Sequence, residues 1–240
     1  MYAEAKEEMS AGNWAAAIKL LEKLESRYPF GRYAQQAQID TAFAQWKDKD
    51  NAQALAAVDR FLKLYPNHDS VDYVLYLKGL INFNDRETLF TNVTGEDMAE
   101  RDPKAAREAF DTFKELINRF PKSQYAEDAT LRMNFLLNML ASNDVHVARF
   151  YMRRGATLAA VNRAQAVVKQ YQETPATEEA LAIMVAGYKQ LAMDNLSADA
   201  RRVLEKNFPN SIYLKVNYDP NIRGGTDAGK PSTWQKIKPW

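Results

Sequence analysis

The residues that could do chemistry in this chain are few and scattered. Only two histidines occur, His68 and His146, and neither has a partner at the His-x-x-x-His spacing that would hold a metal ion. The chain has no cysteine, so thiolate nucleophiles, disulfides and cysteine-ligated metal sites are excluded. No Gly-x-Ser-x-Gly motif supplies an activated serine. We therefore interpret both histidines as solvated or locally bonded side chains, and we predict no metal, no cofactor and no catalytic site.

One motif imitates a nucleotide-binding loop. Residues 224–230 spell the pattern GxxxxGK, in which backbone N–H groups and a lysine would cradle phosphates. The next residue, Pro231, stands where the motif needs a serine or threonine hydroxyl for magnesium. No predicted strand precedes the loop, so we interpret it as part of a flexible tail. The acidic residues alternate with lysines and arginines, which is typical of solvated helix faces and not of paired catalytic carboxylates.

Two groups of side chains are suited to binding. A basic cluster is formed by Arg149, Arg153, Arg154 and Arg163, and two interpretations of it remain open: a solvated face, or a docking surface for an acidic patch. Aromatic residues form the second group.

Phe30 and Tyr33 follow a proline, where turns are usually polar, and we hypothesise that they face a ligand. The aromatics that precede the helix-ending anchors, among them Tyr28 and Tyr171, are expected in the core.

The bulk composition fits a packed helical protein. Hydrophobic residues make up 46% of the 240, and 32 basic residues balance 31 acidic ones to a net charge of +1. This composition excludes a disordered chain and gives no whole-molecule attraction to nucleic acid. No apolar run reaches the length of about 20 residues that a membrane-spanning helix needs.

An internal repeat organises the chain and would position these groups. Segments at 27–37, 64–74, 119–129 and 207–214 share an aromatic–proline pair, and a degenerate copy lies at 170–180. We count positions backwards from the prolines and from Gln172 as anchors. The residues 12, 8 and 5 positions earlier, at offsets −12, −8 and −5, lie on one stripe of a helix, and they are first small and then bulky. The aromatic–proline pair should end each helix, because proline disfavours helical geometry in the preceding residue.

This pattern resembles the tetratricopeptide repeat, a helix–turn–helix unit of about 34 residues. We predict an all-α fold, a right-handed superhelical stack of about five helix pairs over residues 1–214, with a concave face. A flexible tail at 215–240 and a long loop at 85–102 complete the chain. The repeats lie near 2–29, 33–66, 70–121, 123–172 and 176–209. The expected helices lie near 2–10, 14–27, 33–46, 51–64, 70–84, 103–119, 123–141, 144–154, 156–171, 176–192 and 196–207.

Several long segments are similar to the BamD family of outer-membrane assembly lipoproteins. They lie, in the order of that family, at 12–31, 56–80, 99–110, 120–132 and 147–168. The last of these is the most specific, because generic tetratricopeptide repeats lack it. The chain departs from the family in its extended tail and in lacking the lipidated cysteine, which we expect, with the signal peptide, outside this chain.

The resemblance implies a non-enzymatic, lipid-anchored subunit on the periplasmic face of the cell outer membrane. Such a subunit would serve as scaffold and substrate receptor in the machinery that assembles outer-membrane β-barrel proteins. Its implied partners are unfolded outer-membrane proteins, the last periplasmic POTRA domain of a BamA-like barrel subunit, and other Bam lipoproteins, with no nucleic acid.

The resemblance also implies site residues. Carried over, the groove for the unfolded segment includes Trp14, Tyr28, Phe30 and Gly31, with Tyr33 added from its place in the turn. The contact with the BamA-like subunit uses Arg154 and Arg163, with Phe150 and Tyr151 nearby.

Two other classes of protein are compatible with the sequence. A generic periplasmic repeat scaffold would coordinate other cell-envelope proteins but would lack the segment at 147–168. An enzyme with an unrecognised site would need a deep polar pocket.

Overall fold

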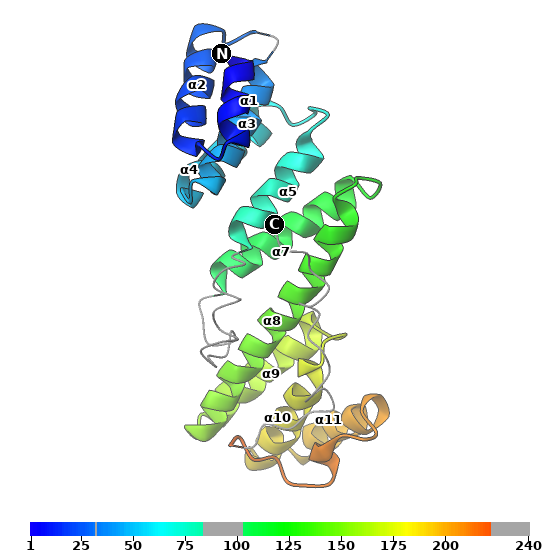
Figure 1. Ribbon diagram of the computed structural model, residues 1–240. Helices are drawn as coiled ribbons and strands as arrows, with labels where there is room; N and C mark the ends of the chain where they lie inside the picture. The colour runs from blue at the N-terminus through cyan, green and yellow to red at the C-terminus, as the bar shows by residue number, and fades with distance from the viewer. Residues whose placement is uncertain (32, 84–102, 222–240) are drawn as a thin grey trace. The chain divides into compact units, whose positions relative to one another are not determined.

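The structure is a computed structural model that describes residues 1–31, 33–83 and 103–221. Within this part the chain forms ten α-helices and no strand (Figure 1). The helices are α1 (Tyr2–Ser10), α2 (Trp14–Arg27), α3 (Ala34–Lys47), α4 (Asn51–Leu64), α5 (Val71–Asn82), α7 (Lys104–Arg119), α8 (Ala126–Arg153), α9 (Thr157–Gln170), α10 (Ala176–Gln190) and α11 (Asp194–Asn207), and a short 3₁₀ helix, η2 (Ile212–Leu214), follows. None of these helices combines the length and apolar character needed to cross a membrane.

The chain divides into two compact units. Among the described residues, the first comprises 1–31, 33–83 and 108–130, and the second comprises 103–107 and 131–221. In the first unit each helix from α1 to α5 packs against the next, and in the second α10 packs between α9 and α11 (Figure 1). The predicted all-α stack of helix pairs is confirmed; its superhelical course and its extent over 1–214 stay predictions. The loop at 85–102 and the tail from residue 222 lie outside the described residues.

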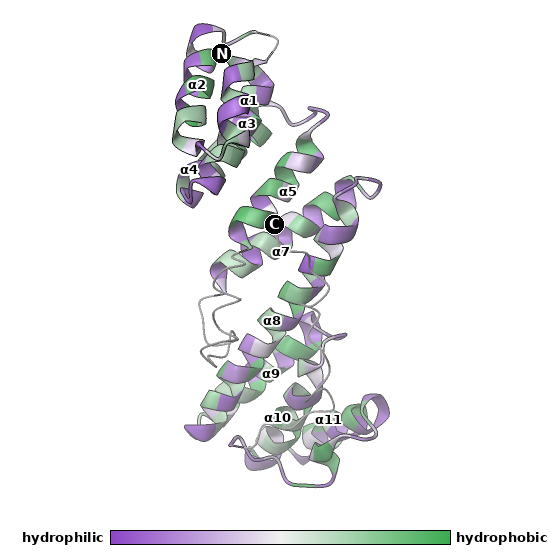
Figure 2. Cartoon of the chain, viewed as in Figure 1, coloured by the Kyte–Doolittle hydropathy of each residue, from purple (hydrophilic) through white to green (hydrophobic). Residues whose placement is uncertain are grey.

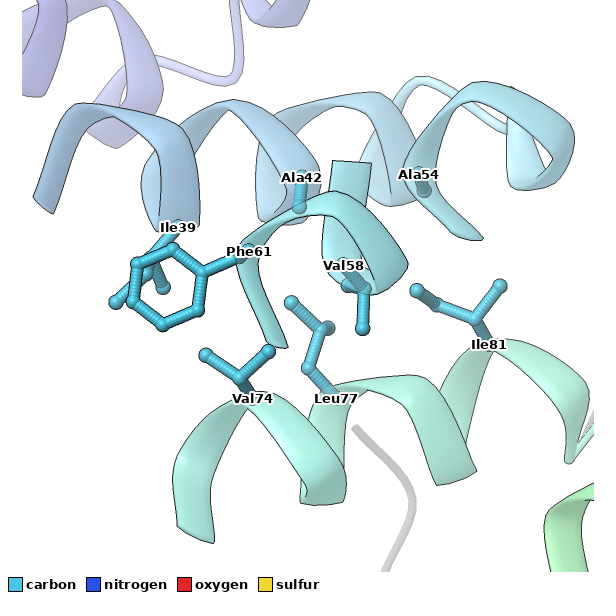
Figure 3. Close-up of a cluster of buried hydrophobic side chains, with 8 residues drawn as sticks. All are labelled: Ile39, Ala42, Ala54, Val58, Phe61, Val74, Leu77 and Ile81. Atoms are coloured by element: carbon cyan, nitrogen blue, oxygen red, sulfur yellow. The ribbon is translucent and has the colours of Figure 1, made fainter. Parts of the chain in front are cut away.

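The repeat stripe forms the core, as predicted. At offset −12 the alanines Ala17, Ala54, Ala109 and Ala160 are fully buried, and at offset −5 the side chains Leu24, Phe61, Leu116, Val167 and Leu204 are buried too. Figure 3 shows how Val58 and Phe61 of α4 lie between α3 and α5, against Ile39, Val74 and Leu77. Colouring by hydropathy shows apolar and polar residues on the same helices (Figure 2), as expected where one face is buried.

The turns inside each helix pair follow one design. The residues Gly12, Lys49, Gly155 and Ala192 all have a positive φ, between 57° and 77°. At each of them the N–H donates to the carbonyl three residues back, and the next N–H donates to the carbonyl five residues back from itself. This is the Schellman motif, which ends a helix on a left-handed residue.

The aromatic–proline pairs end the second helices, as predicted. Helices α2, α4, α7 and α11 each end directly before the aromatic residue of such a pair, and α9 ends directly before Tyr171, which is followed by Gln172 instead of a proline. The prediction that these aromatics lie in the core is confirmed for Tyr171, which is 6% exposed, and is wrong for Tyr28, which is 50% exposed. Tyr28 lies in the turn between α2 and α3.

One predicted helix boundary is wrong. The helices predicted at 123–141 and 144–154 are one helix, because α8 runs unbroken from Ala126 to Arg153 and includes residues 142–144. The segment has no glycine or proline to stop a helix. Asp144 does not cap a new helix; it is buried and accepts a hydrogen bond from Arg163 of α9.

Candidate functional site

An aromatic turn joins α2 to α3 in the first unit. Phe30 is 100% exposed there, and Tyr28 and Tyr33 are also exposed. The turn is tight because the Gly31 N–H donates to the Tyr28 carbonyl oxygen over 2.9 Å. A Cβ atom at position 31 would lie 3.0 Å from that same oxygen, so glycine suits this close approach. Four of the five predicted peptide-binding residues therefore share one turn.

Tyr33 extends this turn onto the first helix. Its ring stacks on that of Tyr2, with centroids 4.6 Å apart and planes 8° from parallel. The Tyr2 hydroxyl donates to Asp40 Oδ2 over 2.8 Å, and Gln36 Nε2 donates to Asp40 Oδ1 over 3.0 Å. Burial and the hydrogen bond to Asp40 raise the pKa of Tyr2 above its ordinary value.

Further tyrosines lie on the following helices of the same unit. The ring of Tyr73, on α5, lies 5.5 Å from that of Tyr125, which directly precedes α8. Burial, with smaller contributions from Tyr125 and Asp40, raises the pKa of Tyr73 to about 12. We call Tyr2, Tyr33, Asp40, Tyr73 and Tyr125 together the tyrosine face.

Sequence reasoning found only Tyr33 of the tyrosine face. A signal for a second member was present, because Tyr125 stands four residues after Pro121 as Tyr33 stands four after Pro29. Tyr2 and Tyr73 have no such register and depend on how the helices pack.

Trp14 lies apart from the other predicted peptide-binding residues. It begins α2, whose 14 residues end just before Tyr28, so about 20 Å of helix separates the two. The Trp14 ring meets the edge of Phe43, with centroids 6.0 Å apart. Phe43 in turn meets Trp46, and the ammonium group of Lys47 lies 4.5 Å from the centre of the Trp46 ring. Trp14 therefore belongs to a second aromatic cluster at the other end of the pair.

The last turns of α8 bring three predicted partner-binding residues together in the second unit. Phe150 is 42% exposed, and its ring lies 6.0 Å from that of Tyr151. The guanidinium of Arg154 lies over the Phe150 ring at 5.4 Å, one helical turn further on. The arrangement offers an exposed aromatic surface with a positive charge above it, which suits an acidic and apolar partner.

Arg163, the fourth predicted partner residue, already has contacts inside the chain. Its Nη1 donates to Asp144 Oδ1 over 3.1 Å, and Asp144 has 5% of its side chain exposed. Arg107 also reaches Asp144, at 3.8 Å, and donates to the Tyr171 hydroxyl over 3.3 Å. Because 42% of the Arg163 side chain remains exposed, Arg163 can contact a partner while it keeps its ion pair with Asp144.

Arg149 is not a surface residue, so neither interpretation of the basic cluster holds for it. It is 8% exposed, and its Nε and Nη2 donate to the two carboxylate oxygens of Glu179 over 2.8 and 2.7 Å. The Tyr218 hydroxyl donates to the same carboxylate over 3.1 Å. This pair joins α8 to α10 and to the chain after η2, a structural role that sequence spacing did not reveal.

The structure gives further information on the residues considered for chemistry. His68 is locally bonded, as predicted, because its Nδ1 accepts from the Ser70 N–H over 3.1 Å. Within residues 1–31, 33–83 and 103–221 no group of three or more potential ligands could hold a metal ion. The GxxxxGK segment at 224–230 lies outside the described residues.

Comparison with known proteins assigns the chain to a family. The family model described as YfiO, outer membrane lipoprotein, matches residues 1–213. The chain is 51% identical to the outer membrane protein assembly factor BamD of Neisseria meningitidis serogroup B, over 90% of this chain and 80% of that protein. It is 40% identical to the protein of the same name from Vibrio cholerae, over 86% of each chain, and 37% identical to that of Xylella fastidiosa, over 100% of this chain and 79% of the relative. The chain therefore belongs to the YfiO family of outer membrane lipoproteins, in agreement with the predicted resemblance to BamD.

Proposed function

We propose that this chain is a non-enzymatic scaffold and substrate receptor of the machinery that assembles β-barrel proteins in the outer membrane. It acts at the periplasmic face of that membrane. The observation that carries the proposal is the 51% identity to an outer membrane protein assembly factor over 90% of the chain. The family model over residues 1–213 supports the same role.

The aromatic turn and the tyrosine face receive the unfolded substrate. An extended segment of a barrel protein presents alternate apolar side chains, and these lie against Phe30, Tyr28 and the stacked rings of Tyr33 and Tyr2. Tyrosine combines a large apolar ring with a hydroxyl that bonds to main-chain groups. Affinity is modest, because an unfolded segment loses conformational entropy when it is ordered.

The exposed end of α8 binds the partner. Phe150, Tyr151 and Arg154 dock on the last POTRA domain of a BamA-like barrel subunit, and Arg163 adds a second positive charge. The partner supplies a carboxylate to the arginines and an apolar surface to Phe150. Other Bam lipoproteins join the same complex. In this arrangement one chain holds both the substrate and the barrel subunit.

Peptide binding to the aromatic turn tests the receptor role. The probe is a labelled ten-residue peptide that alternates aromatic and polar residues and ends in phenylalanine, followed by fluorescence anisotropy. Phe30→Ala should weaken binding by about fivefold to tenfold, the usual effect of removing a central aromatic contact. Since Phe30 is fully exposed, the variant should keep its helical circular dichroism.

Leu64→Ala is the matched control for this experiment. Leu64 is a second exposed apolar residue of the same unit, 56% exposed, and it lies outside the aromatic turn and the tyrosine face. Its removal should leave peptide affinity unchanged. Equal loss in both variants, or no loss in Phe30→Ala, would contradict the proposed site.

A further inference from the structure

A polar groove lies between α2 and α4 in the first unit, with α3 as its floor. It has a volume of about 670 Å³. Its polar lining comes from all three helices: Glu22 and Glu25 of α2, Thr41 and Gln45 of α3, and Gln53 and Arg60 of α4. None of these polar residues belongs to the tyrosine face or to the aromatic turn, from which only Pro29 reaches the groove lining. The groove is therefore a second surface of this unit, to which no role has been assigned.

Helix α3, the floor of the polar groove, carries two glutamines whose side-chain oxygens are buried. Gln38, Thr41 and Gln45 fall on one stripe of α3, since they are three and four residues apart. Gln38 is 6% exposed, and its Nε2 donates to Glu25 Oε1 over 3.0 Å. The side-chain oxygens of Gln38 and Gln45 are buried and accept no hydrogen bond from the described residues. A buried acceptor without a donor costs free energy, so its presence in a groove calls for an explanation.

The fold itself does not require this polarity. Counted from the repeat anchors Pro29 and Gln172, the positions of Glu25, Gln38 and Gln45 correspond to Val168, Leu181 and Tyr188 of the last repeat. Leu181 and Tyr188 are 2% and 6% exposed, and both lie in hydrophobic clusters of the core.

The matching groove of the last repeat is apolar where the polar groove is charged. Val168, Leu181 and Val203 line a groove of about 510 Å³ there, and Val203 stands at the position of Arg60. The same backbone thus accepts an apolar floor, so the glutamines of α3 are not a demand of helix packing.

The charges of the polar groove favour a ligand rich in hydrogen-bond donors. Arg60 is already paired, at 3.4 Å, with Glu25 across the groove. Glu22 is exposed and has no ion pair with a described residue. The Glu22 carboxylate stays available as an acceptor, and the partly exposed Gln45 side chain, which lines the groove, can turn its unpaired oxygen into it. An arginine side chain brings five donors and no acceptor, in a planar group that can meet a carboxylate and an amide oxygen together.

We propose that the polar groove between α2 and α4 binds an arginine side chain of another polypeptide. The guanidinium donates to the carboxylate of Glu22 and to Gln45 Oε1, once the Gln45 side chain turns this oxygen from its buried position into the groove. Glu25 stays fixed by Gln38 and Arg60 and forms the negative wall beside the guanidinium. The small side chains of Ala56 and Ala57, which also line the groove, leave room for the main chain that carries the arginine.

Nuclear magnetic resonance titration of the full chain tests this proposal. The probe is a short glycine peptide with one arginine, blocked at both ends, and the matched peptides carry citrulline or lysine instead. The arginine peptide should shift the side-chain amide signals of Gln45. The citrulline peptide, which has the shape without the charge, should bind about tenfold more weakly, since charge-assisted bonds are roughly twice as strong as neutral ones. Equal binding of citrulline or lysine would overturn the proposal.

Two variants and one control complete the experiment. Gln45→Leu should abolish the arginine-dependent shifts and should leave the melting temperature unchanged or higher, because it removes a buried acceptor without a donor. Glu22→Gln, at an exposed position that no fold contact needs, should weaken binding by about threefold at low salt. Gln165→Leu makes the same change at an exposed position of α9 and should have no effect. Retained binding in Gln45→Leu and Glu22→Gln would show that the groove is not the site.

Discussion

The ring of Phe113 occupies the space that a side chain at position 79 would need. A Cβ atom added to Gly79 would lie 2.7 Å from both Cδ1 and Cζ of that ring. Phe113 is fully buried and also faces Tyr76 and Phe83, with ring centroids 6.2 and 6.3 Å away. The ring cannot turn aside, so glycine lets α5 and α7 approach each other closely.

Gly79→Ala should therefore destabilise the first unit. The added methyl group overpacks the contact with Phe113, and overpacking of a buried site costs about 1–3 kcal/mol. Urea denaturation followed by circular dichroism would measure the loss. A second change, Phe113→Leu, shortens the facing side chain, so the double variant should be more stable than the two separate losses predict. Simple additivity of the two losses would show that the close approach is not the cause.

The turn residues with a positive φ allow us to predict substitutions that raise stability. Lys49 and Ala192 have φ values of 70° and 57°, whereas Gly12 and Gly155 fill the corresponding positions in two other turns. A residue with a Cβ atom is strained by about 1–2 kcal/mol in this conformation. Lys49→Gly and Ala192→Gly should each stabilise the chain by about 0.5–1 kcal/mol, once the greater entropy of glycine in the unfolded chain is subtracted. Thermal melts would measure the gain.

The reciprocal substitution is the control for the turns. A Cβ atom at position 12 meets nothing within 4 Å, so Gly12→Ala isolates backbone strain from crowding. It should destabilise by about 1 kcal/mol. If Gly12→Ala proves neutral, the left-handed conformation cannot explain any gain in Lys49→Gly.

The sequence predicted what is local and periodic in this fold. The anchors at Pro29 and Pro66 marked the ends of α2 and α4, and the stripe of small and bulky residues marked the core, because both depend on spacing along one helix. It did not predict that α8 continues past Asp144, since only the contact with Arg163 makes that aspartate a buried residue of a continuous helix.

The candidate sites likewise contain residues that the local sequence predicts and residues that depend on how the helices pack. Phe30 and Tyr33 stood out because a turn is an unusual place for aromatics. Tyr2 joins them only because α1 packs against α2 and its first residue stacks on Tyr33. Arg149 was grouped with surface arginines by spacing, and its bidentate pair with Glu179 depends on the packing of α10.

Tyr73 provides a pH prediction. Burial, with the charges of Tyr125 and Asp40, raises its pKa from 10.0 to about 12. A tyrosine whose pKa is higher in the folded chain stabilises the fold fully below the unfolded value and loses this contribution as pH rises through the folded one. The contribution of Tyr73 should therefore disappear between about pH 10 and pH 12.

Tyr73→Phe isolates this contribution. Between pH 8 and pH 11.5 the unfolding free energy of the parent should fall by about 1 kcal/mol more than that of the variant, a value reduced from full linkage because the side chain is partly exposed. Urea denaturation at both pH values measures the difference, and tyrosinate absorbance should show one late-titrating group fewer in Tyr73→Phe. If the unfolding free energies of parent and variant fall equally with pH, Tyr73 ionises freely in the folded chain.

Arg154 and Arg163 should contribute to partner binding in separable ways. The Arg154 side chain is exposed and lies over the ring of Phe150, so Arg154→Glu should weaken binding to the BamA-like POTRA domain without changing the melting temperature. Arg163→Glu should lower both the affinity for the POTRA domain and the melting temperature, because it places a second carboxylate beside the buried Asp144. Losing one member of a fully buried ion pair costs about 3–5 kcal/mol, and the exposure of Arg163 reduces that loss.

The double variant Arg163→Gln with Asp144→Asn separates the two roles of Arg163. It replaces the ion pair by a neutral amide pair, which should recover most of the melting temperature lost in Arg163→Glu. Calorimetric titration with the POTRA domain then decides what the arginine does. If affinity stays low while the fold is restored, the Arg163 charge contacts the partner directly. Affinity that returns with stability would limit Arg163 to holding α8 and α9 together, and Arg154 with Phe150 would remain as the docking surface.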